Sequence, residues 1–260
     1  FENNEKYSLC HLVACDGIRS SIREQFFTPN QKPRYSGYSA WRGIGKSNLQ
    51  NVHFALGPGS HIVSYPINNE GDVSFVACTK EAYEFTESWK EEGSYNDLLD
   101  DFSTYDSKIF PAIEDSIKLY KWGIYTRPPL KSMIAHNVTL VGDAAHPMVP
   151  FIGQGACMAI EDAYAFGILC KIQNGDFAEA QKVFNAVRSS RTKKIQRRSM
   201  MQGKIYHMKN PVLVAARNAA MRYTNIPGND LKSIHDYDVE DAIKIYMMVG
   251  RYGSNISPGS

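Results

Sequence analysis

The sequence predicts an α/β protein in which a strand-rich region lies between two strand-loop-helix units and is followed by long helices. Three observations support this fold class. The apolar run over residues 8–14 ends in Cys-Asp-Gly and precedes a helical pattern, Gly, Pro and Asn interrupt the apolar segments of residues 35–80, and helical periodicity dominates after residue 154. With 260 residues, 43% of them hydrophobic, the chain can form one large core or two.

The first strand-loop-helix unit places a strand over residues 8–14 before a helix in SSIREQFF, with Ser20 as its N-cap. Hairpin punctuation such as GPGS and NNEGD then predicts one mixed or antiparallel sheet. Its strands are expected at residues 35–45, 52–57, 61–67 and 72–80. Short helical patterns follow at 95–102 and 107–115, and the segment 117–130 predicts another strand, closed by two prolines.

The second unit begins with NVTLVGDA, a buried strand that is expected to end at Gly142. The remainder of the chain is predicted to be helical, over residues 154–172, 177–207, 211–223 and 239–248. The chain contains no G-x-G-x-x-G loop with an acidic residue about twenty positions later, so we expect a preceding part of a nucleotide-binding fold to be absent.

Composition and charge argue against several classes of protein. No apolar run reaches the roughly 18 residues that cross a bilayer, and the first residues lack the pattern of a secretory signal. The five scattered cysteines have no metal-ligand spacing, which predicts reduced thiols in a cytoplasmic protein and no metal site. Residues 181–229 carry Lys and Arg but no Asp or Glu. Because the net charge of the whole chain is only +2, we expect these basic residues to pair with acids elsewhere in the protein and not to bind nucleic acid.

The segment after the second strand has the features of a ligand site. Gly-Asp at a strand end puts the Asp143 carboxylate at the carboxyl edge of a sheet, where it can accept hydrogen bonds from a polyol, and Gly142 lets a ligand approach the backbone. Pro150 prevents an early helix, and Gly-Gln-Gly then supplies backbone N–H groups at a helix N-terminus, which is an anion site. A flavin meets both demands, with a hydroxylated ribityl chain and a pyrimidine edge that becomes anionic on reduction.

Two motifs then give a specific resemblance. GDAAHPMVPFIGQGACMAIEDA resembles the second flavin motif of the class A flavoprotein monooxygenases, the family of para-hydroxybenzoate hydroxylase, salicylate hydroxylase and 6-hydroxynicotinate 3-monooxygenase, and ACDGIRSSIR resembles the D-G-x-x-S-x-x-R motif of that family. The resemblance implies an incomplete FAD-binding three-layer domain with an inserted mixed or antiparallel β-sheet substrate domain and C-terminal helices. The implied parts are residues 1–30 and 131–175 for the FAD-binding domain, 31–130 for the substrate domain and 176–260 for the helical region.

The resemblance also implies roles for individual residues. Asp143 would bind the ribityl or ribose hydroxyls, the backbone of residues 153–156 would lie under the pyrimidine edge, and Pro150 would line the oxygen and substrate side. Asp16 and Arg23 would serve the FAD pyrophosphate region and the transient approach of NAD(P)H, and Gly17 would permit a tight turn. The cofactor-binding set is thus Asp16, Gly17, Arg23, Gly142, Asp143, Pro150, Gly153, Gln154, Gly155 and Ala156. The chain departs from the family at Ala14-Cys15 and at Cys157.

The candidate catalytic residues are His61, Tyr65 and Pro150. His61 and Tyr65 share one face of the strand 61–67, because side chains alternate with period two, and could hydrogen-bond or deprotonate a phenol. The relative that acts on hydroxynicotinate has a His and a Tyr on the equivalent strand. An equally weighted alternative is that Tyr65 belongs to the core and that His61 bonds a backbone carbonyl.

By resemblance, the protein is an oxidoreductase in which NAD(P)H reduces FAD and oxygen forms a flavin C4a-hydroperoxide that hydroxylates a small aromatic or heteroaromatic substrate. The alternatives are an epoxidase of the same family and a catalytically silent fragment that lacks the ADP-binding half of the FAD site. The expected partners are the substrate and O2, without nucleic acid or stable membrane insertion; a missing N-terminal segment and a homodimer partner are both left open.

Overall fold

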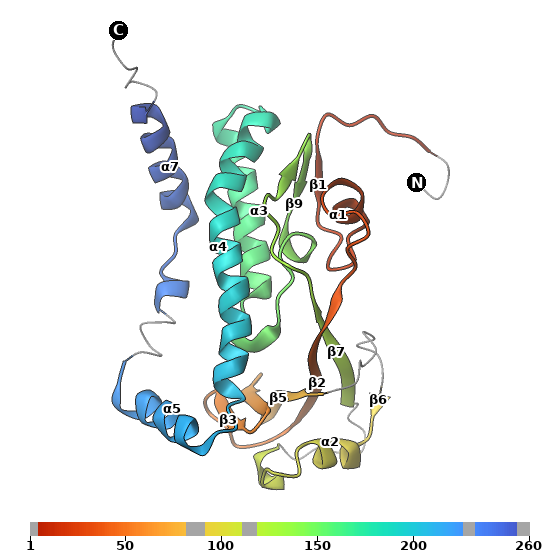
Figure 1. Ribbon diagram of the computed structural model, residues 1–260, viewed down its shortest axis with the longest axis vertical. Coiled ribbons are helices and arrows are strands. Elements are labelled where there is room, and N and C mark those ends of the chain that lie inside the picture. Colours follow the sequence, from red (N-terminus) through yellow and green to blue (C-terminus); the bar gives the residue numbers. More distant parts are fainter. Residues whose placement is uncertain (1–4, 82–91, 111–118, 226–231, 254–260) are drawn as a thin grey trace. The chain divides into compact units, whose positions relative to one another are not determined.

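A computed structural model of the chain describes residues 5–81, 92–110, 119–225 and 232–253 (Figure 1). The chain divides into two compact units. Unit 1 consists of residues 1–33, 127–199 and 229–260, and unit 2 of residues 34–126 and 200–228. Unit 1 therefore contains both predicted cofactor motifs, and unit 2 contains the strand-rich region.

Unit 1 contains a three-stranded sheet in the order β1-β9-β8. Strands β1 (Leu12–Ala14) and β9 (Val138–Leu140) pair in parallel, and β8 (Ile134–Ala135) is antiparallel to β9. Both longer strands are shorter than predicted. In particular, β9 ends at Leu140 rather than at Gly142, because residues Gly142–Ala144 form a 3-10 turn in which Gly142 adopts a left-handed φ of 58°.

The helices of unit 1 cover this sheet and bury its apolar side chains. They are α1 (Ser21–Phe26), α3 (Gly155–Ile172), the part of α4 (Phe177–Tyr206) up to residue 199, and α7 (Val239–Gly253). Figure 1 shows α3 and α4 side by side next to β9, and a shared core joins them. That core includes Leu140 of β9, Leu169 of α3, Phe184 of α4 and Ile243 of α7, all at most 1% exposed.

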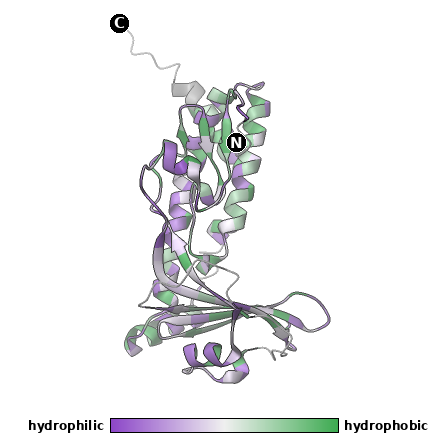
Figure 2. Ribbon diagram, turned by 90° about the vertical axis from the view of Figure 1, so that its right-hand side faces the viewer, coloured by the Kyte–Doolittle hydropathy of each residue, from purple (hydrophilic) through white to green (hydrophobic). Residues whose placement is uncertain are grey.

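Unit 2 is built on a six-stranded sheet in the order β3-β4-β5-β2-β7-β6, with antiparallel pairing throughout. Its strands are β2 (Arg34–Lys46), β3 (His53–Gly57), β4 (Ser60–Pro66), β5 (Asp72–Lys80), β6 (Glu92–Gly93) and β7 (Leu119–Thr126). Along the second half of β2, buried and exposed residues alternate, as expected when one face packs and the other is polar. Hydrophobic and hydrophilic residues are accordingly mixed along these strands (Figure 2).

Three shorter elements complete unit 2. Helix α2 (Tyr95–Asp101) carries Leu98, which packs with Trp41 and Phe75 in the core of the unit. A 3-10 helix spans Ser107–Ile109 and ends at Phe110, which is extended, so the helix predicted over 107–115 does not continue there; residues 111–115 lie outside the described residues. Helix α5 (Pro211–Tyr223) has the predicted bounds. The observed sheets and helices confirm the predicted α/β class, and within the described residues no helix is both long and apolar enough to span a bilayer.

Candidate functional site

The Gly-Asp turn of unit 1 packs tightly against α3. The N–H of Gly142 donates to Oδ2 of Asp162 at 3.0 Å. A Cβ atom added at Gly142 would lie 3.2 Å from the Cβ of Ala159, and its φ of 58° already disfavours other residues. The close neighbour of this glycine is thus the helix, which fixes the direction in which the next residue leaves the strand.

That next residue, Asp143, is exposed, and its carboxylate makes no hydrogen bond or ion pair with any residue that the structure describes. Although the residue as a whole is exposed, neighbouring atoms desolvate its carboxyl group and raise its pKa, while the charge of His146 acts in the opposite direction. An acceptor that is held at a strand end without a protein partner is available to the hydroxyl groups of a ligand.

Asp162 of α3 is the residue that holds the turn in place. Its fully buried carboxylate accepts hydrogen bonds from Nε2 of His146 at 2.5 Å and from Nε of Arg188 at 2.9 Å, in addition to the N–H of Gly142. Burial alone would raise the pKa of Asp162, but the bond from His146 and the charges of His146 and Arg188 lower it overall. Asp162 is therefore an ionised anchor, and no pattern in the sequence distinguishes it from the aspartate at position 143.

The N-terminus of α3 is not capped by any side chain that the structure describes. Pro150–Ile152 forms a 3-10 turn, Gly153 adopts a left-handed φ of 62°, and α3 starts at Gly155. No side chain caps the helix, its first turn contains no acid, and a Cβ atom at Gly155 would meet nothing within 4 Å. The first N–H groups of a helix have no intrahelical partner, so those of Gly155 and Ala156 can bind a negatively charged group, as the Gly-Gln-Gly pattern predicted.

Helix α4 fixes the loop that leads to Pro150. Nε2 of Gln196 donates to the carbonyl of Pro147 at 2.7 Å, and Oγ of Ser199 donates to the carbonyl of Val149 at 2.5 Å. Both donors are buried. These bonds satisfy two carbonyls in a segment that lacks regular structure, and they set the position of the proline that was predicted to line the substrate side.

The Asp-Gly segment contributes side chains to the start of helix α1. Oδ2 of Asp16 accepts the N–H of Ser21 at 2.9 Å, and Ser20 caps the same helix, α1, by accepting the N–H of Arg23. Gly17 has a φ of 77°, which fits the predicted tight turn. The carboxylate of Asp16 thus contributes to the start of α1, and its role at the FAD pyrophosphate region, which the family resemblance implies, stays a prediction.

Arg23 is fully buried, and its guanidinium connects the two motifs. Nη1 donates to the carbonyls of Ala144 and Ala145 at 3.2 and 2.9 Å, and Nη2 donates to the carbonyl of Pro128 at 2.9 Å. Burial, and then the charge of Arg127, lower the pKa of Arg23 to about 10, so it stays charged at neutral pH. These contacts fasten the Asp-Gly segment to the Gly-Asp turn. The role of Arg23 toward the FAD pyrophosphate and NAD(P)H, which the family resemblance implies, stays a prediction.

His61 and Tyr65 lie on β4 of unit 2. His61 is 2% exposed, and its Nδ1 lies 2.6 Å from Nε2 of His207, whereas Tyr65 is half-buried. The structure thus adds a second histidine as a partner of His61, and the two alternatives for His61 from the sequence stay predictions. His207 follows α4, 146 residues later in the chain, and no sequence signal connected it with His61.

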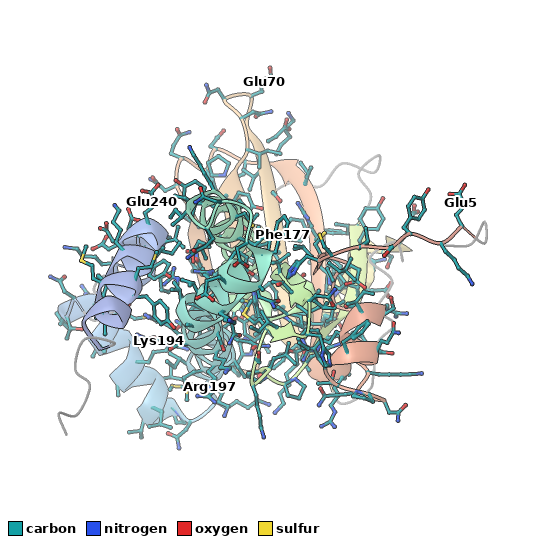
Figure 3. All side chains as sticks on the ribbon, turned by 90° about the horizontal axis from the view of Figure 1, so that it is seen from above. Glu5, Glu70, Phe177, Lys194, Arg197 and Glu240 are labelled. Carbon is teal, nitrogen blue, oxygen red and sulfur yellow. The ribbon has the colours of Figure 1, made fainter. Side chains whose placement is uncertain are left out.

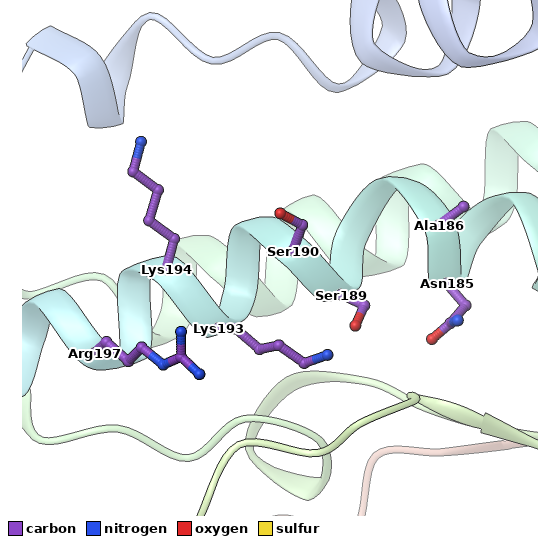
Figure 4. A pocket seen from close by; sticks show the side chains of 7 residues that line it. All are labelled: Asn185, Ala186, Ser189, Ser190, Lys193, Lys194 and Arg197. Atoms are coloured by element: carbon purple, nitrogen blue, oxygen red, sulfur yellow. The ribbon is translucent and has the colours of Figure 1, made fainter.

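The basic residues of α4 divide into paired and unpaired groups. Arg188 and Arg191 both bind Glu161, at 2.5 and 2.7 Å, which confirms the expected pairing with acids. Lys194 and Arg197, marked in Figure 3, have no acidic partner among the described residues. They line a pocket of about 610 Å³, in which Lys193 and Arg197 extend to one side and Lys194 to the other (Figure 4).

The described residues contain no cluster of His, Cys, Asp and Glu that could hold a metal ion.

Comparisons with known proteins agree with these features. Residues 4–210 match the family described as FAD binding domain. The chain is 30% identical over 204 residues to 3-amino-4-hydroxybenzoate 2-monooxygenase PtmB3 of Streptomyces platensis, covering 76% of this chain and 51% of that protein. It is 28% identical to salicylate hydroxylase of Pseudomonas putida, covering 93% and 62%. The chain thus spans about half to two thirds of the length of these relatives.

Solved structures share the fold. A salicylate hydroxylase substrate complex superimposes with a TM-score of 0.80 at 21% identity, covering 93% of this chain and 65% of that one. HpxO of Klebsiella pneumoniae, complexed with FAD and uric acid, gives a TM-score of 0.71 at 24% identity, covering 83% and 56%. At these identities the likeness shows the architecture.

Proposed function

This chain belongs to the FAD binding domain family, and from that premise we propose that it is part of an FAD-dependent monooxygenase that hydroxylates a small aromatic or heteroaromatic ring. NAD(P)H is the proposed reductant and O2 the second substrate. The names of the relatives support this reaction class, since they include monooxygenases and hydroxylases of benzoate derivatives and salicylate. The free cysteines fit the reducing cytoplasm that we propose as its location.

One observation carries the proposal: in one packed segment, the exposed carboxylate after β9 has no partner among the described residues, and none of their side chains caps the N-terminus of α3. FAD fits these groups for two reasons. Asp143 can accept hydrogen bonds from the hydroxyl groups of FAD, and the N–H groups of Gly155 and Ala156 can bind the pyrimidine edge of the flavin, which gains negative charge on reduction. When bound, FAD would supply the electron transfer and oxygen activation that amino-acid side chains do not provide.

The chain's own residues would orient the ligand and stabilise charge. The first N–H groups of α3 form a fixed set of dipoles, which stabilise a negative charge without rearrangement during the reaction. Asp162 and His146 hold the Gly-Asp turn, and Gln196 holds the loop before Pro150. We propose that this rigidity keeps Asp143 and Pro150 in the positions at which they contact cofactor and substrate.

On the substrate side, we propose that His61 and Tyr65 contact the polar substituents of the ring. An imidazole can donate a hydrogen bond through one ring nitrogen and accept one at the other, which suits recognition of a hydroxyl group. A tyrosine hydroxyl can donate or accept, so it can bind a second substituent. These roles favour hydroxylated aromatic acids or hydroxylated heteroaromatic rings.

The proposal is tested with the FAD-loaded enzyme, NADH or NADPH, and a panel of hydroxylated benzoates and pyridine acids. We expect one group of substrates to accelerate oxidation of the reduced nucleotide and to yield products heavier by one oxygen atom. The variant His61→Ala is compared with a control variant, His53→Ala. His53 lies on β3 in the same unit and is exposed. If no ring compound is hydroxylated by enzyme that binds and reduces FAD, the monooxygenase assignment is wrong.

A further inference from the structure

A row of polar side chains follows one face of α4 at intervals of four residues. It consists of Asn185, Ser189, Lys193 and Arg197, and all four line the pocket of about 610 Å³. Residues four apart lie above one another on a helix, so the four side chains point to the same side of α4 (Figure 4). Four residues of a helix rise about 6 Å, and the row therefore extends over about 18 Å.

The first two residues of the row offer hydrogen-bond donors that the described protein does not use. Oδ1 of Asn185 accepts the N–H of Met133 at 2.8 Å and the hydroxyl of Ser132 at 3.3 Å. Since a backbone N–H can only donate, these bonds fix the orientation of the amide and leave its Nδ2 hydrogens without a partner among the described residues. Ser189 is 8% exposed, and its hydroxyl has no partner among them either. A hydroxyl this deeply buried at the wall of a pocket gains a partner only from what enters the pocket.

The last two residues of the row are cations. Nζ of Lys193 donates to the carbonyl of Lys131 at 2.9 Å, which positions the ammonium group while two of its hydrogens remain for a ligand. The guanidinium of Arg197 makes no hydrogen bond or ion pair with a described residue. Lys194 adds a third positive charge to the lining. Like charges three or four residues apart on a helix repel, so an anion bound to Lys193 and Arg197 would relieve this repulsion.

The two segments that form this region supply no acid to neutralise the cations. Neither residues 180–206 nor residues 127–141 contain Asp or Glu. By contrast, Arg188 and Arg191 of the same helix are both paired with Glu161 of α3. A solvated helix face would account for exposed lysines alone. It would not account for Asn185 and Ser189, whose unused donors lie in the same row as the unpaired charges.

We propose that this pocket of α4 is a binding site for the phosphate monoester of a small organic molecule. Lys193 and Arg197 would bind the phosphate, which carries a charge of about −1.5 to −2 at neutral pH, and the planar guanidinium fits two phosphate oxygens. Ser189 and Asn185 would donate to oxygen atoms in the remainder of the molecule, such as those of a sugar. A volume of about 610 Å³ lies within the usual range of pockets for small molecules.

Two sources of such a ligand can be distinguished by their chemistry. One is NADPH, a candidate for the proposed reductant, which carries a phosphate monoester on its adenosine ribose; NADH lacks that group. The other is a phosphorylated sugar or nucleotide that takes no part in the flavin reaction. The site itself does not depend on the proposed function, because its donors and charges are present whichever reaction the protein catalyses.

Binding is tested by titrating the ¹⁵N-labelled 260-residue chain and following the Nε–H signal of Arg197 in ¹H–¹⁵N spectra. The probes are adenosine 2′-phosphate, glucose 6-phosphate, NADPH and NADH, with adenosine and glucose as controls. We expect a saturable shift with the phosphate monoesters, weakened by added salt, and none with adenosine or glucose. A shift with NADPH but not with NADH supports the site and identifies the reductant as a source. A shift with glucose 6-phosphate but not with NADPH supports the site and assigns it to another metabolite. No saturable shift with any monoester overturns the proposal.

Variants then test whether the row, rather than surface charge in general, binds the phosphate. We expect Lys193→Ala and Arg197→Ala each to weaken binding of adenosine 2′-phosphate on the order of tenfold, measured by calorimetry, and Ser189→Ala on the order of fivefold. Lys182→Ala is the matched control, because Lys182 is an exposed cation of α4 outside the pocket and pairs with Glu179 at 3.1 Å.

The control should bind as the parent chain does, and urea unfolding verifies that every variant is folded. Unchanged binding by both Arg197→Ala and Lys193→Ala overturns the proposal. So does an equal loss in Lys182→Ala, since the attraction would then come from the charge of the whole helix. Unchanged binding by Ser189→Ala, with a loss in the two cation variants, would contradict the proposed contribution of the neutral donors.

Discussion

The carboxylate of Asp162 accepts a hydrogen bond from Nε2 of His146 at 2.5 Å, and the same carboxylate accepts the N–H of Gly142 and Nε of Arg188. One buried anion thus joins the Gly-Asp turn to two helices of unit 1. Asp143, only one residue after Gly142, has no such partner among the described residues. The two aspartates therefore differ: Asp162 is an anchor inside the fold, and Asp143 is exposed and is proposed to face a ligand.

Asp162→Asn is expected to lower the free energy of unfolding by about 3 kcal/mol, because the buried Arg188 loses a charged partner. Asp143→Asn, the matched control, is expected to change it by less than about 0.5 kcal/mol, since the side chain is exposed. Urea unfolding of both variants measures the difference. Equal stability of the two would show that Asp162 does not anchor the turn.

Arg23→Lys should destabilise unit 1 although the charge is kept. The guanidinium reaches three carbonyls through two nitrogens, and a single ammonium group cannot reproduce that planar geometry. We expect a loss of about 1–3 kcal/mol, the range for a buried acceptor left without its donor. Arg34→Lys, at an exposed position, is the control in the same urea experiment. No difference between the two variants would contradict the bridging role.

Two glycines of the motif should respond oppositely to alanine. Gly142→Ala is expected to cost about 1–2 kcal/mol, because φ is left-handed and the new Cβ would meet Ala159. Gly155→Ala places its Cβ in open space at the start of α3, and should leave stability unchanged or raise it by about 0.4–1 kcal/mol. Gly155→Ala should nevertheless weaken FAD binding, because the methyl group occupies the approach to the helix N-terminus. Tight FAD binding by this variant would show that the cofactor does not bind at the N-terminus of α3.

The histidine pair predicts acid sensitivity. The folded-state pKa values, about 3 for His61 and about 4 for His207, lie below the unfolded value of 6.5. Below pH 6.5 the unfolded chain binds protons that the folded chain does not, so the free energy of unfolding falls as pH falls. At pH 5 the loss is about 2 kcal/mol for each histidine relative to pH 7 or above.

Urea unfolding at pH 7 and pH 5 measures this effect. The double variant His61→Phe/His207→Phe should lose that part of the pH dependence, whatever its stability at pH 7. The interval from pH 7 to pH 5 lies above the range in which Asp162 titrates, so its carboxylate does not contribute. An unchanged pH dependence in the double variant would show that the pair is not buried and neutral.

Much of the fold follows from local signals. The bounds of β5 and α5 were predicted to the residue; Asn and Gly directly precede the strand, and Pro211 follows Asn210, which caps the helix. Ser20 was correctly predicted as the cap of α1. The FAD binding domain family, indicated by two motifs, is confirmed by the match over residues 4–210. These features depend on neighbours in sequence, which a single chain reveals.

The contacts of the candidate site could not be predicted in the same way. The direction of the Arg23 guanidinium, the choice of Asp162 over Asp143 as the anchor, and the pairing of His61 with His207 all depend on residues that meet only after folding. A charged residue in a motif is equally compatible with a ligand contact and with a structural bond. The sequence pattern therefore indicated the segments of the candidate site, and the packing of the helices determined the hydrogen-bond partners within them.

The central claim, that Asp143 and the start of α3 form a flavin site, is tested most directly by titrating the chain with FAD and following flavin absorbance and fluorescence. Three proteins are compared: the parent chain, Asp143→Asn, and Asp236→Asn as a control at an exposed acid elsewhere in unit 1. We predict saturable binding that Asp143→Asn weakens at least about tenfold, from loss of a charged acceptor, and that the control retains. Equal affinity of all three, or no binding by the folded parent chain, would contradict the claim.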